Sequence, residues 1–194
     1  MAISLEKGGR VNLSKEAPGL AQVIVGLGWD QRVTDGSDFD LDASVFLLSP
    51  EGKARGEQDF VFYNNATALN GAVKHMGDNR TGAGEGDDEV IEVDLKAILD
   101  SADDIQKLVF VTTIHDAEAR KQNFGQVENA FIRIVDKSNN KEIVRFDLTE
   151  DYSVETAMIF GELYVKDGEW RFGAVGSGFG GGLSAVCSKY GLTI

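Results

Sequence analysis

The chain has 194 residues, of which 42% are hydrophobic and 26% are charged, and its formal net charge is −13. This length suits one domain with a sizeable buried core, so we expect a single domain over residues 1–194. The acidic balance argues against a nucleic-acid partner, whose phosphates require a basic surface, and against direct binding to anionic lipid.

The sequence lacks the signals of secretion and of membrane insertion. Its first 16 residues contain no apolar run of the kind found in signal peptides, and no stretch approaches the ~20 apolar residues of a membrane helix. The single cysteine, Cys187, has no partner for an internal disulfide and fits a reducing compartment. We therefore expect a cytoplasmic protein without direct membrane insertion.

Apolar and polar side chains alternate along most of the chain, which is the period-two pattern of β-strands. This pattern predicts strands over residues 11–13, 22–29, 38–48, 59–63, 90–94, 107–114, 130–136, 142–148, 158–166 and 169–175. Short helices are expected over residues 95–102, capped by Asp94, and over residues 183–190, followed by Gly191 as the C′ residue. Short strands at hairpin spacing with few helices predict a mainly β protein, an antiparallel β-sandwich.

Acidic residues concentrate in three segments beside the predicted strands. The first runs from Asp30 to Asp42, the second combines residues 63–65 with the glycine-rich run 75–89, and the third is His115-Asp116. Alternate strands of a sandwich end on the same side, so we expect the three segments to meet at one end. Carboxylates this close repel one another unless a cation lies among them, and Ca²⁺ takes about six to eight oxygen ligands from adaptable loops. A solvated acidic surface is the alternative interpretation.

No single segment matches a known calcium loop. Asp38, Asp40 and Asp42 have the spacing that begins an EF-hand, but Ala43 and Ser49 stand at the positions of its glycine and its terminal glutamate. A calcium site in this protein would therefore be discontinuous, with ligands from several loops.

Common catalytic motifs are missing from the sequence, which contains no HExxH, GxSxG or P-loop pattern. We therefore expect a binding protein and not an enzyme. Two alternatives stay open. The acidic segments could hold Mg²⁺ or Mn²⁺ in a phosphoester hydrolase with His115 as its base. The second alternative is a lectin-like sandwich that binds sugars through calcium loops.

Six motifs spread over almost the whole chain carry a family resemblance. They are GLGWD (26–30), DFDLDAS (38–44), FYNN (62–65), GDNRTGAGEGDDE (77–89), TIHDAEARKQNFG (113–125) and GELYVKDGEWRF (161–172). Together they resemble the TerD family, which comprises bacterial tellurite-resistance and general-stress proteins. The motifs do not distinguish TerD-, TerE- and TerZ-like members from general-stress relatives.

The resemblance implies a cytoplasmic β-sandwich that binds Ca²⁺ through acidic loops at one end. It also implies an adaptor or signalling role in tolerance of tellurite and other oxidants, together with other Ter-family proteins, some of them in a membrane-associated complex. Because Cys187 is the only thiol, we expect that role to be indirect. The metal ligands implied by the motifs are Asp30, Asp38, Asp40, Asp42, Asp78, Asp87, Asp88 and Asp116, supported by Asn64, Asn79 and Glu89.

Overall fold

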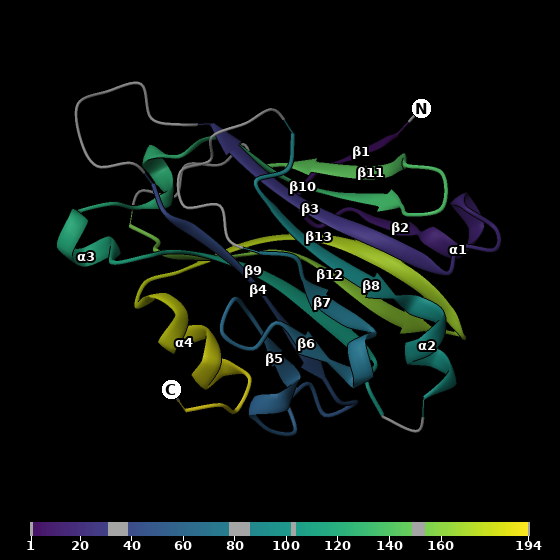
Figure 1. The fold of residues 1–194 in the computed structure, drawn as a ribbon. Helices are drawn as coiled ribbons and strands as arrows, with labels where there is room; N and C mark the ends of the chain where they lie inside the picture. Colours follow the sequence, from purple (N-terminus) through teal and green to yellow (C-terminus); the bar gives the residue numbers. More distant parts are fainter. Residues whose placement is uncertain (1, 31–38, 78–85, 102–103, 149–153, 194) are drawn as a thin grey trace.

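The computed structural model of the chain describes residues 2–30, 39–77, 86–101, 104–148 and 154–193 (Figure 1). Two β-sheets pack face to face, with a few short helices at their margins, which confirms the predicted β-sandwich. Among the described residues, no helix is both long enough and apolar enough to cross a membrane.

The two sheets are built almost entirely from antiparallel neighbours, and the exception is the parallel pair β1–β11. In spatial order, the seven-stranded sheet contains β1 (Ile3–Leu5), β11 (Lys141–Asp147), β10 (Glu128–Asp136), β3 (Gln22–Asp30), β8 (Glu89–Asp94), β7 (Val73–His75) and β6 (Thr67–Ala68). The six-stranded sheet contains β2 (Arg10–Asn12), β13 (Glu169–Phe179), β12 (Ala157–Lys166), β9 (Lys107–Ile114), β4 (Leu41–Leu48) and β5 (Phe60–Val61).

Helical segments are short and lie in the connections between strands. The α-helices are α1 (Leu13–Glu16), α2 (Leu95–Asp100), α3 (Ala117–Arg120) and α4 (Gly182–Lys189), and the 3₁₀ turns are η1 (Glu57–Asp59), η2 (Leu69–Gly71) and η3 (Phe124–Gln126). The predicted cap of α2 is confirmed, because the Asp94 carboxylate accepts a hydrogen bond from the Ala97 N–H at 2.8 Å. This helix ends at Asp100, and its expected last residue, 102, lies outside the described residues.

The main core fills the space between the two sheets. Alternate residues of β3 point inward, and Val23, Val25 and Leu27 are at most 1% exposed. They pack in one apolar cluster with the inward side chains of the other sheet, including Phe110 and Phe172. The period-two pattern therefore places one face of each central strand in this core.

A second apolar cluster lies on the outer face of the six-stranded sheet, where α4 covers it. Val186 and Cys187 of α4 pack there against Phe46 and Ile159. The helix ends as expected before Gly191, whose φ of +86° is unfavourable for other residues. The Gly191 and Leu192 N–H groups donate to the last carbonyls of the helix at 3.2 and 2.9 Å.

Most predicted strands shift by one or two residues at an end, and the last one extends beyond residue 175 to Phe179. Three of the differences have a clear local cause. The strand expected at residues 38–48 begins only at Leu41, because its partner β9 ends at Ile114 and the chain then turns at Asp116, where φ is +50°. The strand expected at 59–63 shrinks to Phe60–Val61, because Phe62 and Asn65 exchange backbone hydrogen bonds and close a turn. The strand expected at 11–13 ends one residue early, since α1 begins there.

Burial of Cys187 predicts a thiol that does not react in the folded protein. Its side chain is inaccessible to solvent, and desolvation raises the pKa of the thiol to about 11. At pH 8 only about one thiol in a thousand is ionised at that pKa, and the thiolate is the reactive form. We expect Ellman's reagent to label Cys187 within minutes in 6 M guanidinium and only over many hours in buffer; comparable rates in both would contradict this burial.

Candidate metal centre

Described parts of all three acidic segments meet at one end of the sandwich, although Asn64 of the second segment is not among them. Strands β3 and β9 end there, at Asp30 and Ile114, and β4 and β8 begin there (upper left in Figure 1). The registers Leu27↔Glu89 and Leu41↔Ile114 bring these strand ends to the same level. The described acidic residues gathered at this end are Asp30, Asp40, Asp42, Asp87, Asp88, Glu89 and Asp116.

Glu89 lies inside the sandwich and joins its two sheets. Its Oε2 lies 3.0 Å from Nε2 of His75, and both side chains are 1% exposed. The same Nε2 is 3.1 Å from the Ala43 carbonyl of β4, and the Ala43 N–H points to Glu89 Oε2 at 3.5 Å. Since the Gly77 N–H donates to Nδ1 at 3.2 Å, we assign the imidazole proton to Nε2, where it serves both acceptors.

Sequence reasoning gave His75 no partner, because its partner lies fourteen residues later on a neighbouring strand. The signal that could have found the pair is periodicity: His75 follows buried Val73 at a spacing of two, so its side chain had to enter the core. Glu89 has the same spacing before Ile91. Two titratable groups on inward positions of neighbouring strands need each other as partners.

Removing His75 should destabilise the protein strongly, because the Glu89 carboxylate would remain buried without its imidazole donor. We expect His75→Ala to lower the free energy of unfolding by about 3 kcal/mol in guanidinium titrations. His115→Ala is the matched control, since the His115 side chain is 46% exposed; its cost should stay within about 0.5 kcal/mol. Equal costs for the two variants would contradict a structural role of the buried pair.

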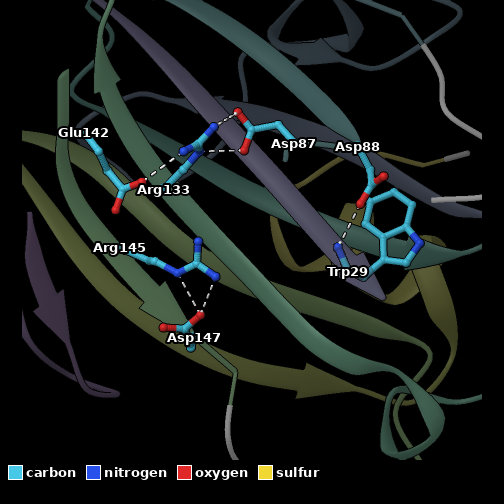
Figure 2. A network of polar contacts seen from close by, with 7 residues as sticks. All are labelled: Trp29, Asp87, Asp88, Arg133, Glu142, Arg145 and Asp147. Atoms are coloured by element: carbon cyan, nitrogen blue, oxygen red, sulfur yellow. Dashed lines mark hydrogen bonds and ion pairs between the residues drawn. The ribbon is translucent and has the colours of Figure 1, made fainter. Parts of the chain in front are cut away.

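Two hydrogen bonds fix Asp88 to the C-terminal end of β3. Its N–H donates to the Leu27 carbonyl at 2.8 Å, and its Oδ2 accepts from the Trp29 N–H at 2.9 Å (Figure 2). Burial raises the pKa of Asp88, the Trp29 hydrogen bond partly offsets this, and the negative charges of Asp87, Glu89 and Asp30 raise the pKa further. The ionised form of Asp88 is therefore less favoured in the metal-free protein than it is for an aspartate in water.

The raised pKa of Asp88 determines how its contribution to the free energy of unfolding changes with pH. Folding favours the protonated carboxyl, so the contribution of Asp88 is most favourable below its ordinary pKa of 3.8 and is lost as the pH rises through the raised value. We expect Asp88→Asn, whose amide oxygen still accepts from Trp29, to raise the melting temperature without metal at pH 7. The gain should shrink towards pH 4. A lower melting temperature at pH 7 would contradict the unfavourable charge.

Two other carboxylates of the seven-stranded sheet have protein donors. Asp87 accepts from Arg133 with both oxygens, at 2.7 and 3.1 Å, and Arg133 also donates to Glu142 at 3.0 Å (Figure 2). The Asn129 amide donates to Asp30. Asp87 is thus occupied by a protein cation, whereas the donor that the described residues offer to Asp30 is the neutral amide of Asn129.

The carboxylates of the six-stranded sheet have longer contacts with basic groups. Asp40 Oδ2 lies 3.9 Å from an Arg120 nitrogen. Nδ1 of His115 is 4.0 Å from Asp42 Oδ2, and its Nε2 is 3.4 Å from Asp116 Oδ2. The Asp40–Arg120 and Asp42–His115 distances are longer than those of direct hydrogen bonds.

Four of the expected ligands are not brought into this group by the described structure. Asn64 is exposed at the tip of the Phe62–Asn65 turn, beyond edge strand β5. Asp38, Asp78 and Asn79 lie outside the described residues. Within the described ranges, no three His, Cys, Asp or Glu side chains are grouped closely enough to hold a metal ion. The donors at this end are oxygen atoms of carboxylates, which is the chemistry of a hard cation such as Ca²⁺.

Comparison with known proteins places this architecture in a family. The TerD domain matches residues 1–190 of the chain. The chain belongs to the TerD family. It is 59% identical to the tellurium resistance protein TerD of Serratia marcescens over 192 residues, which cover 99% of this chain and 98% of that protein. It is 57% identical to general stress protein 16U of Bacillus subtilis over the whole length of both.

A solved structure shows the same fold at much lower sequence similarity. A homologue of the telluride resistance protein TerD from Streptomyces coelicolor superposes with a TM-score of 0.65 at 21% identity, over 88% of this chain and 96% of that one. The family of this chain is therefore one of tellurium-resistance and general-stress proteins, and the Streptomyces homologue has the same fold.

Proposed function

We propose that this TerD-family protein is a cytoplasmic, non-catalytic calcium-binding adaptor of the stress response. Ca²⁺ would neutralise the carboxylates at one end of the sandwich and order the acidic loops into a surface that a partner binds. The proposed partners are other Ter-family proteins, including a membrane-associated complex. Tellurite tolerance would then follow from signalling or assembly, since Cys187, the single thiol, is buried.

The observation that carries this proposal is the meeting of carboxylates from three chain segments. Asp40, Asp88 and Asp116 come from three parts of the chain that are far apart in sequence, yet they lie beside strand ends at the same end of the sandwich. Burial raises the pKa of Asp88, and the negative charges of Asp87, Glu89 and Asp30 raise it further, so a negative charge is less favourable there than in water. A divalent cation would favour the ionised form, and the all-oxygen donor set suits Ca²⁺ better than Zn²⁺.

The proposed ligand set combines described residues with residues known from the sequence motifs. We propose Asp88 as the central ligand, because it lies between the end of β3 and the start of β8. Its hydrogen bonds to Leu27 and Trp29 hold it there. The further proposed ligands are Asp30, Asp40, Asp42 and Asp116 from the described ranges, and Asp38, Asp78 and Asn79 from the acidic motifs.

Thermal melting with and without metal tests the proposal. Binding to the folded state alone should add about 2.7 kcal/mol at a hundredfold excess of Ca²⁺ over Kd, and therefore raise the melting temperature relative to EDTA. Asp88→Asn should lose most of this rise. Asp104→Asn is the matched control, since Asp104 is exposed near the start of β9, at the opposite end from the acidic group.

Trp29 provides a second, local readout. Trp29 is 5% exposed, and its backbone N–H donates to the Asp88 carboxylate. The other tryptophan, Trp170, donates its indole Nε1–H to the carbonyl of Leu95, the first residue of α2. In Trp170→Phe the fluorescence therefore reports on Trp29 alone, and Ca²⁺ should change it with the Kd found by calorimetry. No response to Ca²⁺, Mg²⁺ or Mn²⁺ in either experiment would refute metal binding.

The same protein can be tested for the competing hydrolase. Turnover of phosphate monoesters or diesters with Mg²⁺ or Mn²⁺, abolished by His115→Ala, would contradict a non-catalytic role. Rapid consumption of tellurite by the purified protein would contradict an indirect one.

A further inference from the structure

The acidic run Asp87–Glu89 is held on both faces of the seven-stranded sheet. Asp87 lies on the outer face, where Arg133 binds its carboxylate through two nitrogens (Figure 2). Glu89 lies on the inner face against His75. Asp88, between them, is bonded to the backbone of β3 at Leu27 and Trp29. Three consecutive carboxylates thus point to three different partners.

Two glycines of β3 make room for this arrangement. In the register of β10 with β3, Arg133 stands beside Gly26. A Cβ atom at Gly26 would lie only 2.2–2.3 Å from the atoms of the Asp87 carboxyl group, so any larger residue would displace it. A Cβ at Gly28 would lie 2.8 Å from the Gly86 carbonyl oxygen. The segment Gly86–Asp87 therefore rests directly on the backbone of β3.

We propose that Arg133 and Asp87 form a latch that positions Asp88 for the cation, so that Asp87 is a positioning residue and not a ligand. This inference rests on the calcium-binding function proposed above. The bidentate pair occupies both Asp87 oxygens, and it fixes the residue directly before Asp88 to a central strand of the sheet. Glu142 holds the same guanidinium from β11, so the arginine itself has little freedom to leave.

The latch and a purely electrostatic site predict opposite changes in Ca²⁺ affinity when Arg133 is replaced. Replacing Arg133 with a neutral residue makes this end of the protein more negative, and a purely electrostatic site would then bind Ca²⁺ more tightly. A site that depends on the position of Asp88 would bind Ca²⁺ more weakly, because side chains that orient metal ligands typically contribute ten- to hundredfold in affinity.

The experiment compares Arg133→Gln with Arg145→Gln by calorimetry with Ca²⁺. Arg145 is the cross-strand neighbour of Arg133 on β11, pairs with Asp147 and stacks on Phe131, so its removal changes the net charge equally and leaves the latch intact. We expect Arg133→Gln to weaken Ca²⁺ binding about tenfold and Arg145→Gln to leave it within about twofold. Equal or tighter binding by Arg133→Gln would overturn the proposal.

A double-mutant cycle separates positioning from ligation. If Asp87 acts only through Arg133, Asp87→Asn should weaken binding no further in the Arg133→Gln background. An additional tenfold loss in the double variant would show that Asp87 is itself a ligand and would overturn the assignment. Gly26→Ala breaks the latch without any change of charge and should resemble Arg133→Gln; Gly173→Ala, with the nearest atom at 3.5 Å, is its control.

Amide hydrogen exchange in EDTA keeps this inference distinguishable from the proposed function. With the latch broken, the Asp88 amide, which donates to Leu27, should exchange faster in Arg133→Gln and Gly26→Ala than in Arg145→Gln. Unchanged exchange would overturn the latch whether or not Ca²⁺ binds. If exchange rises but the wild-type protein binds no Ca²⁺, the function fails, and the latch is only a structural contact without a role in cation binding.

Discussion

Repulsion among carboxylates is the constraint on which one end of this sandwich depends. The ends of β3, β4, β8 and β9 bring acidic residues together, and each must find a partner, be protonated or attract a cation. The protein solves part of this problem internally, because Arg133 neutralises Asp87 and the His75 imidazole donates to Glu89. Burial and the neighbouring negative charges both raise the pKa of Asp88, and a bound cation would favour its ionised form.

The partners of these carboxylates also determine how the acidic end is attached to the rest of the fold. The His75–Glu89 pair reaches the Ala43 backbone and so links the two sheets, while the Asp87–Arg133 pair lies on the opposite face. The run 77–89 is acidic and rich in glycine. Its described C-terminal end, Asp87–Glu89, is attached to the sandwich by charged and backbone hydrogen bonds.

Membership in the TerD family is consistent with a scaffold that presents loops. The sandwich persists in a Streptomyces homologue at 21% identity, whereas this chain keeps 59% identity with the Serratia TerD protein over nearly the whole length. In such a fold the strands supply a rigid frame and the strand ends carry the residues that bind. In this protein the acidic side chains gather at one such set of strand ends, those of β3, β4, β8 and β9.

Local patterns in the sequence determined the central strands, the Asp94 cap and the helix end at Gly191, because each depends on residues a few positions apart. The convergence of the acidic segments also followed from the sequence, since antiparallel connections return alternate strand ends to one side. Only the tertiary structure decided that β4 begins at Leu41, since that limit is set by the end of β9.

The partner of Asp87 was likewise decided by tertiary structure alone. Arg133 is 46 residues from Asp87, and the contact requires both the strand register and the space above Gly26. Neither leaves a periodic signal in the sequence. The sequence therefore determined which residues are acidic and at which end they meet, whereas the pairing of strands decided which protein groups contact them, as Arg133 contacts Asp87 and His75 contacts Glu89.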